Sequence, residues 1–145
     1  MLKLERYRIL TIGKTRKQWI KDGIAVYLKR MPGLKVVELR EGDPKRESET
    51  IKAALRNDEQ LVALAEEGET LTSVEFSNHL QSLGSQKIVF TIGGSKGLTE
   101  EIKSLASWKL SLSPLTFPHE LAALILAEQI YRAQNILRGT PYHRD

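Results

Sequence analysis

The sequence predicts an α/β domain with a mostly parallel sheet and helices on both of its faces. Short runs rich in β-branched residues alternate along the chain with segments whose apolar residues recur at helical spacing. The run at 87–92 is the clearest candidate for a central strand of a parallel sheet. The 145 residues suffice for one domain with a core, which we expect to span 1–145.

The expected elements begin with a strand at 7–12, which ends at Gly13. A helix follows, because apolar residues recur at helical spacing from Trp19 to Met31, and the Pro-Gly pair at 32–33 stops it. A second strand is expected at 35–39, where valine residues lie together.

The middle of the chain begins with a heavily charged segment, 41–59, which is typical of a solvated loop entering a short surface helix. Residues 61–64 form a buried type of strand. Thr72 and Glu75 then form a capping box, in which the Thr72 hydroxyl accepts from the third helical N–H and Glu75 reaches back. The helix that they open is closed by Gly84.

The last third is expected to contain two strands, at 87–92 and 108–112, and two helices. Acidic residues in the first turn suit the N-terminal dipole of a helix that begins at Thr99. Pro118 suits the first turn of the final helix, and Gly139 suits the position that follows its end. Strands and helices therefore alternate to the end of the chain.

The final helix is apolar nearly all round from Leu121 to Ala127, whereas a surface helix has a single apolar face. It must be buried on several sides, either in the monomer core or across a homodimer. We favour the homodimer, because a small domain has few places to bury such a helix completely. Glu128 and Arg132 are spaced as i, i+4 partners, which also fits a plain ion pair at the rim of an interface.

Composition narrows the classes of function. Lys and Arg number 22 against 18 Asp and Glu, and the net charge of +4 permits an anionic partner without requiring one. There is no cysteine and the three histidines are isolated, so we expect neither a thiol nucleophile nor a metal site. The longest apolar run is too short to span a membrane and the N-terminal residues do not resemble a signal peptide, so we expect a cytoplasmic protein.

Two loops that follow strands could line a ligand pocket. Gly93-Gly94-Ser95-Lys96-Gly97 follows the central strand, and its glycines allow a ligand to approach the backbone. It matches neither the dinucleotide-binding pattern nor the P-loop, so a tight strand-to-helix turn is an equally good interpretation. Residues 111–118 are a strand end and loop rich in Ser and Pro, without charges. Together the two loops suit an adenine or ribose better than a bare phosphate, although the second also fits a simple connection with capping residues.

The chain ends in Pro141-Tyr142-His143-Arg144-Asp145, whose side chains can take part in proton and phosphate chemistry. A terminal histidine is more often disordered than catalytic, so this tail alone decides nothing. Of the other histidines, His79 is expected to pack within a helix. His119 lies in a first helical turn, where a neutral imidazole is favoured and could orient a loop.

Five motifs occur in a fixed order, and together they resemble the RlmH-type methyltransferases of the SPOUT class over the whole chain. The C-terminal third carries the most specific part of this resemblance. The motifs are Phe90-Thr91-Ile92-Gly93-Gly94-Ser95-Lys96-Gly97-Leu98, Leu110-Ser111-Leu112-Ser113, Leu115-Thr116-Phe117-Pro118-His119, Glu128-Gln129-Ile130-Tyr131-Arg132-Ala133 and Pro141-Tyr142-His143-Arg144.

The resemblance implies methylation of N3 of a pseudouridine in 23S rRNA, with S-adenosylmethionine as methyl donor and no metal. It also implies an obligate homodimer and a deep trefoil knot at the C-terminal side, although threaded chains are otherwise essentially absent from folds. We expect the assembled ribosome to be the substrate. The cofactor contacts that the resemblance implies are Leu64, Gly94, Ser113, Pro114, Leu115, Thr116, Phe117 and Pro118.

Three tail residues are expected to perform the chemistry of such an enzyme. The imidazole of His143 suits a general base at neutral pH. Arg144 could hold a phosphate or stabilise negative charge on the base carbonyls, and Tyr142 could stack on or hydrogen-bond the nucleobase. We expect the tail of one subunit to complete the pocket of the other.

Two places depart from the family pattern. Ala123 stands where Arg is usual, and the run Leu64–Glu69 lacks the common acid and lysine. Asp145 stands where Glu is common and keeps its charge. Two other classes of function remain compatible with the sequence, namely a nucleotide-binding regulatory module and a non-catalytic RNA- or ribosome-binding protein.

Overall fold

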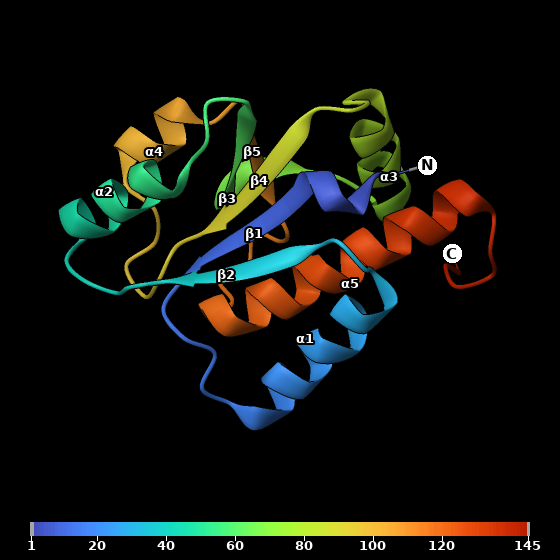
Figure 1. Ribbon diagram of the computed structural model, residues 1–145, viewed down its shortest axis with the longest axis horizontal. Helices are drawn as coiled ribbons and strands as arrows, with labels where there is room; N and C mark the ends of the chain where they lie inside the picture. Colours follow the sequence, from blue (N-terminus) through green and yellow to red (C-terminus); the bar gives the residue numbers. More distant parts are fainter. Residues whose placement is uncertain (1, 145) are drawn as a thin grey trace.

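Five strands form a single sheet with the order β2-β1-β4-β3-β5, and every neighbouring pair runs parallel (Figure 1). This confirms the predicted parallel sheet and the central place of the strand at 87–92. The computed structural model describes residues 2–144, so Asp145 lies outside the described residues. The strands are β1 (Tyr7–Ile12), β2 (Lys35–Leu39), β3 (Glu59–Thr70), β4 (Lys87–Ile92) and β5 (Trp108–Ser111).

Helices cover both faces of the sheet, as predicted (Figure 1). On one face, α1, α3 and α5 pack a core that includes Ile20, Phe76 and Leu126 against the strands. On the other face, α2 and α4 contribute Ile51 and Ile102 to a smaller core. The helices are the 3-10 turn η1 (Leu4–Arg6), α1 (Gln18–Arg30), α2 (Pro44–Ala54), α3 (Ser73–Ser82), α4 (Glu100–Leu105) and α5 (His119–Arg138).

Polar caps fix where several helices begin. Thr72 accepts a hydrogen bond from the Glu75 N–H at 3.1 Å, and the Glu75 carboxylate accepts from the Thr72 N–H at 2.8 Å, which confirms the predicted capping box. The Thr99 hydroxyl caps α4 by accepting a hydrogen bond from the Ile102 N–H at 3.3 Å. Pro118, which we expected inside the first turn of α5, is instead its N-cap, because its carbonyl accepts the first helical hydrogen bond, from the Ala122 N–H at 3.0 Å, and the helix begins at His119.

Strand β3 is longer than the expected strand at 61–64, because it contains an irregularity. Leu110 of β5 is the partner of both Leu64 and Glu69, so the residues between them bulge out of the ladder. We call residues 65–68 the β3 bulge. Gly68 makes the bulge possible, since a Cβ there would lie 2.8 Å from the carbonyl carbon of Lys109.

Helix α5 is apolar nearly all round because two other helices flank it within one subunit. Ala123 and Leu126 are buried against the sheet, α1 packs Gly23 against Leu124, and α3 hydrogen-bonds Gln129 through Ser73 at 2.7 Å. The monomer core therefore accounts for much of the apolar surface from which we predicted a dimer. One side of α5 is only half-buried, and it carries Leu121, Ile125, Glu128 and Arg132 at helical spacing.

Candidate functional site

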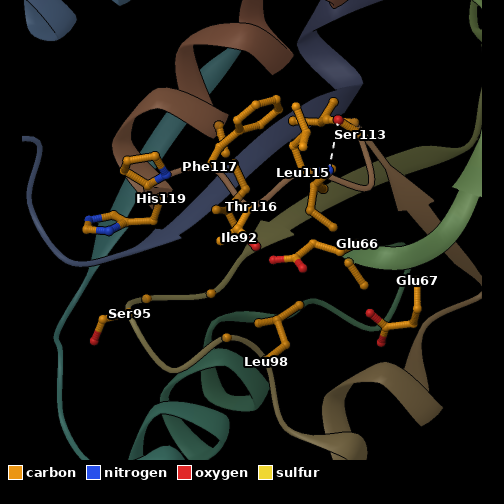
Figure 2. A pocket seen from close by; sticks show the side chains of 18 of the residues that line it. Glu66, Glu67, Ile92, Ser95, Leu98, Ser113, Leu115, Thr116, Phe117 and His119 are labelled. Carbon is orange, nitrogen blue, oxygen red and sulfur yellow. Dashed lines mark hydrogen bonds between the residues drawn. The ribbon is translucent and has the colours of Figure 1, made fainter.

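A pocket of about 710 Å³ opens at the carboxyl ends of β4 and β5 and beside the β3 bulge, and this volume is within the range of small-molecule sites (Figure 2). Ligands of open α/β sheets bind beyond the carboxyl ends of the strands, as here. Three segments form most of the wall, at 64–67, 92–98 and 112–119, and Lys103 and Ala122 complete it.

The pocket brings together all the predicted cofactor residues except Pro114. Ser113 accepts a hydrogen bond from the Leu115 N–H at 3.0 Å, which closes a tight turn with Pro114 at its exposed tip. Pro114 therefore shapes the loop without lining the cavity. The residues on the wall are Leu64, Gly94, Ser113, Leu115, Thr116, Phe117 and Pro118.

The glycine loop after β4 is both a tight turn and part of the wall. A Cβ on Gly93 would lie 2.6 Å from the carbonyl carbon of Gly97, so only glycine fits there. The Gly97 N–H donates to the Gly94 carbonyl at 3.0 Å and closes the turn. The two interpretations of this loop from sequence are thus compatible, because the turn presents its backbone to the cavity.

The β3 bulge brings two carboxylates to the pocket. Lys103 of α4 donates to Glu67 at 2.6 Å, and this hydrogen bond lowers the pKa of Glu67 and raises the pKa of Lys103. Glu66 points into the cavity from the neighbouring position (Figure 2). Our sequence interpretation did not assign either residue to a site, although a run of acids directly after the Leu64 strand was a signal.

His119 also lines the pocket and was not among the predicted site residues. Its Nε2 atom is buried and has no hydrogen-bond partner among the described residues. A buried polar atom without a protein partner marks a place where a ligand or water supplies one. The pocket thus combines an apolar wall, exposed backbone and an imidazole nitrogen that needs a partner.

The tail does not lie in the pocket of its own chain, because it packs against the C-terminal half of α5 (Figure 1). Tyr142 donates to Glu128 at 2.8 Å, and its ring meets Tyr131 edge-on at 4.7 Å between centroids. Glu128 lies nine residues after His119, or about 14 Å along the helix at 1.5 Å per residue. The pocket is therefore at the first turn of α5, and the tail lies against the middle of the same helix.

A second contact fixes the hydrogen-bonding state of the tail imidazole. Arg132 pairs with Glu128 at 2.7 Å, and its Nη1 lies 3.1 Å from Nδ1 of His143. Because a guanidinium can only donate, Nδ1 must accept, and a neutral imidazole then carries its hydrogen on Nε2. Arg144, the remaining predicted catalytic residue, is exposed beside them.

The phenol of Tyr142 is a donor rather than a base. Burial raises its pKa above the ordinary tyrosine value, and the hydrogen bonds with Tyr27 and Glu128 raise it further. The Arg132 guanidinium also lies over the Tyr142 ring, 4.9 Å from its centroid. These contacts hold the tail in one place on α5.

Between residues 2 and 144, no three or more His, Asp and Glu side chains are grouped so that they could hold a metal ion. No helix within those residues is both long enough and apolar enough to cross a membrane.

Comparison with known proteins first identifies the class of protein. Residues 6–143 match the model of a family described as predicted SPOUT methyltransferases, so the chain belongs to the SPOUT class. Two curated relatives, both named ribosomal RNA large subunit methyltransferase H, match this chain along nearly its whole length. The one from Synechococcus sp. (strain CC9311) is 62% identical over 139 residues and covers 96% of both chains. The one from Prochlorococcus marinus (strain MIT 9211) is 54% identical over 145 residues and covers all of both. The chain belongs to this RlmH family.

Solved structures of low identity share the fold. A probable methylase family protein from Haemophilus influenzae Rd KW20 has a TM-score of 0.64 at 14% identity, covering 98% of this chain and 72% of that one. The SpoU methyltransferase AviRb from Streptomyces viridochromogenes has a TM-score of 0.54 at 15% identity, covering 96% of this chain and 63% of that one. At these identities the likeness concerns the fold alone.

Proposed function

We propose that the protein is an S-adenosylmethionine-dependent methyltransferase that methylates N3 of a pseudouridine in the 23S rRNA of the large ribosomal subunit. The observation that carries this proposal is the pocket, which is built from the loops that bear the family motifs at 93–97 and 113–118. The two relatives at 62% and 54% identity are named ribosomal RNA large subunit methyltransferase H, and these names support an rRNA substrate. We further propose that the chain forms a deep trefoil knot at its C-terminal side.

The wall of the pocket fits an adenosine-based methyl donor. Leu64 and Phe117 supply apolar surface, and the loops at Gly94 and Ser113–Pro118 supply backbone donors and acceptors. The buried Nε2 of His119 offers a hydrogen bond that no described residue satisfies. When bound, the donor supplies a methyl group on a positively charged sulfur.

We propose a homodimer in which the tail of one subunit completes the pocket of the other. Helix α5 has the pocket at its first turn and the tail about 14 Å further along. A two-fold axis through its half-buried side packs two copies antiparallel, so that each tail lies beside the other pocket. On α1, which packs against α5 through Gly23 and Leu124, Trp19 and Val26 are 60% and 46% exposed and offer further apolar surface.

The tail residues have separate roles in this composite site. His143 accepts the N3 proton, for which its Nδ1 must exchange the Arg132 hydrogen bond for the nucleobase N–H. Arg144 stabilises negative charge on the base carbonyls or holds a phosphate, and the neutral Tyr142 orients the base. The remaining contribution is the positioning of two bound reactants, worth up to roughly 7–11 kcal/mol in favourable cases.

The direct test is transfer of tritiated methyl from S-adenosylmethionine to ribosomes that lack the modification, with free rRNA and unrelated RNA alongside. Mass spectrometry of nuclease digests then identifies the methylated atom. His143→Ala should abolish most turnover and leave donor affinity nearly unchanged. Donor binding without transfer would indicate a nucleotide-binding module instead. RNA binding with a steep salt dependence and no thermal shift on adding the donor would indicate a non-catalytic RNA-binding protein.

A further inference from the structure

We infer that Glu66 interacts with the positive charge of the methyl donor and so makes the pocket prefer the donor over its uncharged product. This inference rests on the proposed function, because it concerns the same pocket. It goes beyond that function by assigning donor selectivity to one side chain of the β3 bulge.

The bulge explains how an exposed acid reaches the cavity. An uninterrupted strand would place alternate side chains on opposite faces of the sheet and continue past the pocket. Here the register jumps from Leu64 to Glu69 opposite Leu110, which lifts residues 65–68 out of the ladder. Figure 2 shows the result, in which the Glu66 carboxylate points into the cavity, toward the space between Ile92 and Leu98.

The charges around the pocket leave Glu66 uncompensated. Glu67 is paired with Lys103 at 2.6 Å, so these two charges largely cancel. The Glu66 carboxylate has no hydrogen bond or ion pair to any residue between 2 and 144. Apart from His119, the described lining residues include no other titratable side chain. The cavity therefore has one negative charge to offer to a ligand.

S-adenosylmethionine has the charge that matches this site. Its ammonium and carboxylate groups cancel, and its sulfonium leaves a net charge of +1. In the reaction the bond between the methyl carbon and N3 forms, the bond between that carbon and sulfur breaks, and the sulfur keeps the electron pair. The N3 proton goes to the general base, His143, and the product S-adenosylhomocysteine has no net charge. The attraction to Glu66 is thus present for the donor and absent for the product.

Binding constants test the inference directly. Isothermal titration calorimetry would compare S-adenosylmethionine, S-adenosylhomocysteine and sinefungin, which has a protonated amine in place of the methylsulfonium. Because this site is partly exposed to solvent, Glu66→Gln should weaken the binding of the two cationic ligands, S-adenosylmethionine and sinefungin, about five- to tenfold. The substitution should change the affinity for S-adenosylhomocysteine by less than about twofold, because this ligand carries no net charge for Glu66 to attract. Added salt should reduce the preference for the cations in the wild type and have little effect on it in the variant.

Two further variants control the experiment. Glu66→Asp keeps the charge, so it should retain most of the preference. Glu69→Gln removes the same charge at the end of the bulge but outside the cavity, and its amide oxygen can still accept from Trp108 Nε1, now 2.9 Å from Glu69. It should bind all three ligands like the wild type. Thermal unfolding of each variant checks that the fold is intact.

The outcomes separate this inference from the proposed function. If Glu66→Gln weakens all three ligands equally, the carboxylate contacts their shared adenosine or amino-acid part and the charge argument fails. If it weakens none, Glu66 has no role in binding and the inference also fails. A wild-type protein that binds none of the three ligands would instead overturn the donor itself, and with it the proposed function.

Discussion

A composite site makes a sharp prediction for mixed dimers. His143→Ala removes the proposed base from the tail, and Gly93→Ala deforms the pocket. Each variant homodimer lacks one component at both of its sites and should be inactive. A mixed dimer should regain one intact site, in which the tail of the Gly93→Ala subunit meets the pocket of the His143→Ala subunit.

The expected size of the effect follows from the structure. A Cβ on Gly93 would lie 2.6 Å from the carbonyl carbon of Gly97 and 2.7 Å from the nitrogen of Leu98. Both are backbone atoms, so the loop must move and the wall it forms is lost. Loss of a general base costs about 10²- to 10⁴-fold, which puts a His143→Ala homodimer at about 1% of wild-type activity or less. The mixed dimer has one of two sites intact and should recover about half of wild-type activity.

The assay requires two differently tagged subunits, co-expressed and purified in tandem, with methyl transfer to unmodified ribosomes as the readout. A matched control pairs a wild-type subunit with a subunit that carries both substitutions. If the tail acts on the partner, this control is inactive, because each of its sites lacks one component. A control with half of wild-type activity, together with an inactive mixed dimer, would refute the composite site.

Three further predictions concern the tail, a cap and a buried phenol. Tyr142→Phe removes the hydrogen bond to Glu128 and should lower the free energy of unfolding by about 1 kcal/mol in urea titrations. Thr72→Ala removes the acceptor for the Glu75 N–H and should cost about 1 kcal/mol in the same assay. Burial raises the pKa of Tyr7 from 10.0 to about 12, so the unfolded chain loses this proton first as pH rises. The contribution of Tyr7 to the free energy of unfolding should therefore be fully present below pH 10 and fall as the pH rises toward 12. Tyr7→Phe should flatten that part of the profile of unfolding free energy against pH.

The strands most easily predicted from sequence are those buried on both faces of the sheet. The bounds of β1 and β4 agree with the expected strands, because such strands are short apolar runs with turn residues at their ends. The bounds of β2, a partly exposed edge strand, also agree, because its adjacent valines favour a strand. The helix caps at Thr72 and Thr99 were equally predictable, since they depend on residues only three positions apart. Local signals of this kind require no knowledge of the tertiary structure.

Features that depend on distant parts of the chain could not be predicted in the same way. The β3 bulge depends on the approach of Gly68 to the backbone of Lys109, which is visible only once β3 and β5 are paired. The apolar character of α5 had two explanations from sequence, and the flanking positions of α1 and α3 account for much of it within one subunit. Periodicity reports how many sides of a helix are apolar, but not which neighbours cover them.

The candidate site shows the same division. The two uncharged loops were recognisable because glycine, serine and proline follow strands there, and both line the pocket. Glu66 and Lys103 were missed because they come from separate elements that meet only through the order of the strands. The spacing of Glu128 and Arg132 predicted their ion pair, whereas nothing local indicated that both also contact the tail.

The contacts of the tail also bear on when it can react. On its own helix, His143 directs Nδ1 at a guanidinium, and a neutral imidazole bound in this way presents an N–H at its other nitrogen. Such a ring cannot accept the N3 proton until the Arg132 contact is exchanged. In the proposed composite site, the nucleobase that provides the exchange binds beside a pocket about 14 Å away along α5 in the same chain, so the pocket of another subunit must bring it there. Activation of His143 then requires both the dimer and the bound nucleobase, and a monomeric variant should bind the donor without transferring its methyl group.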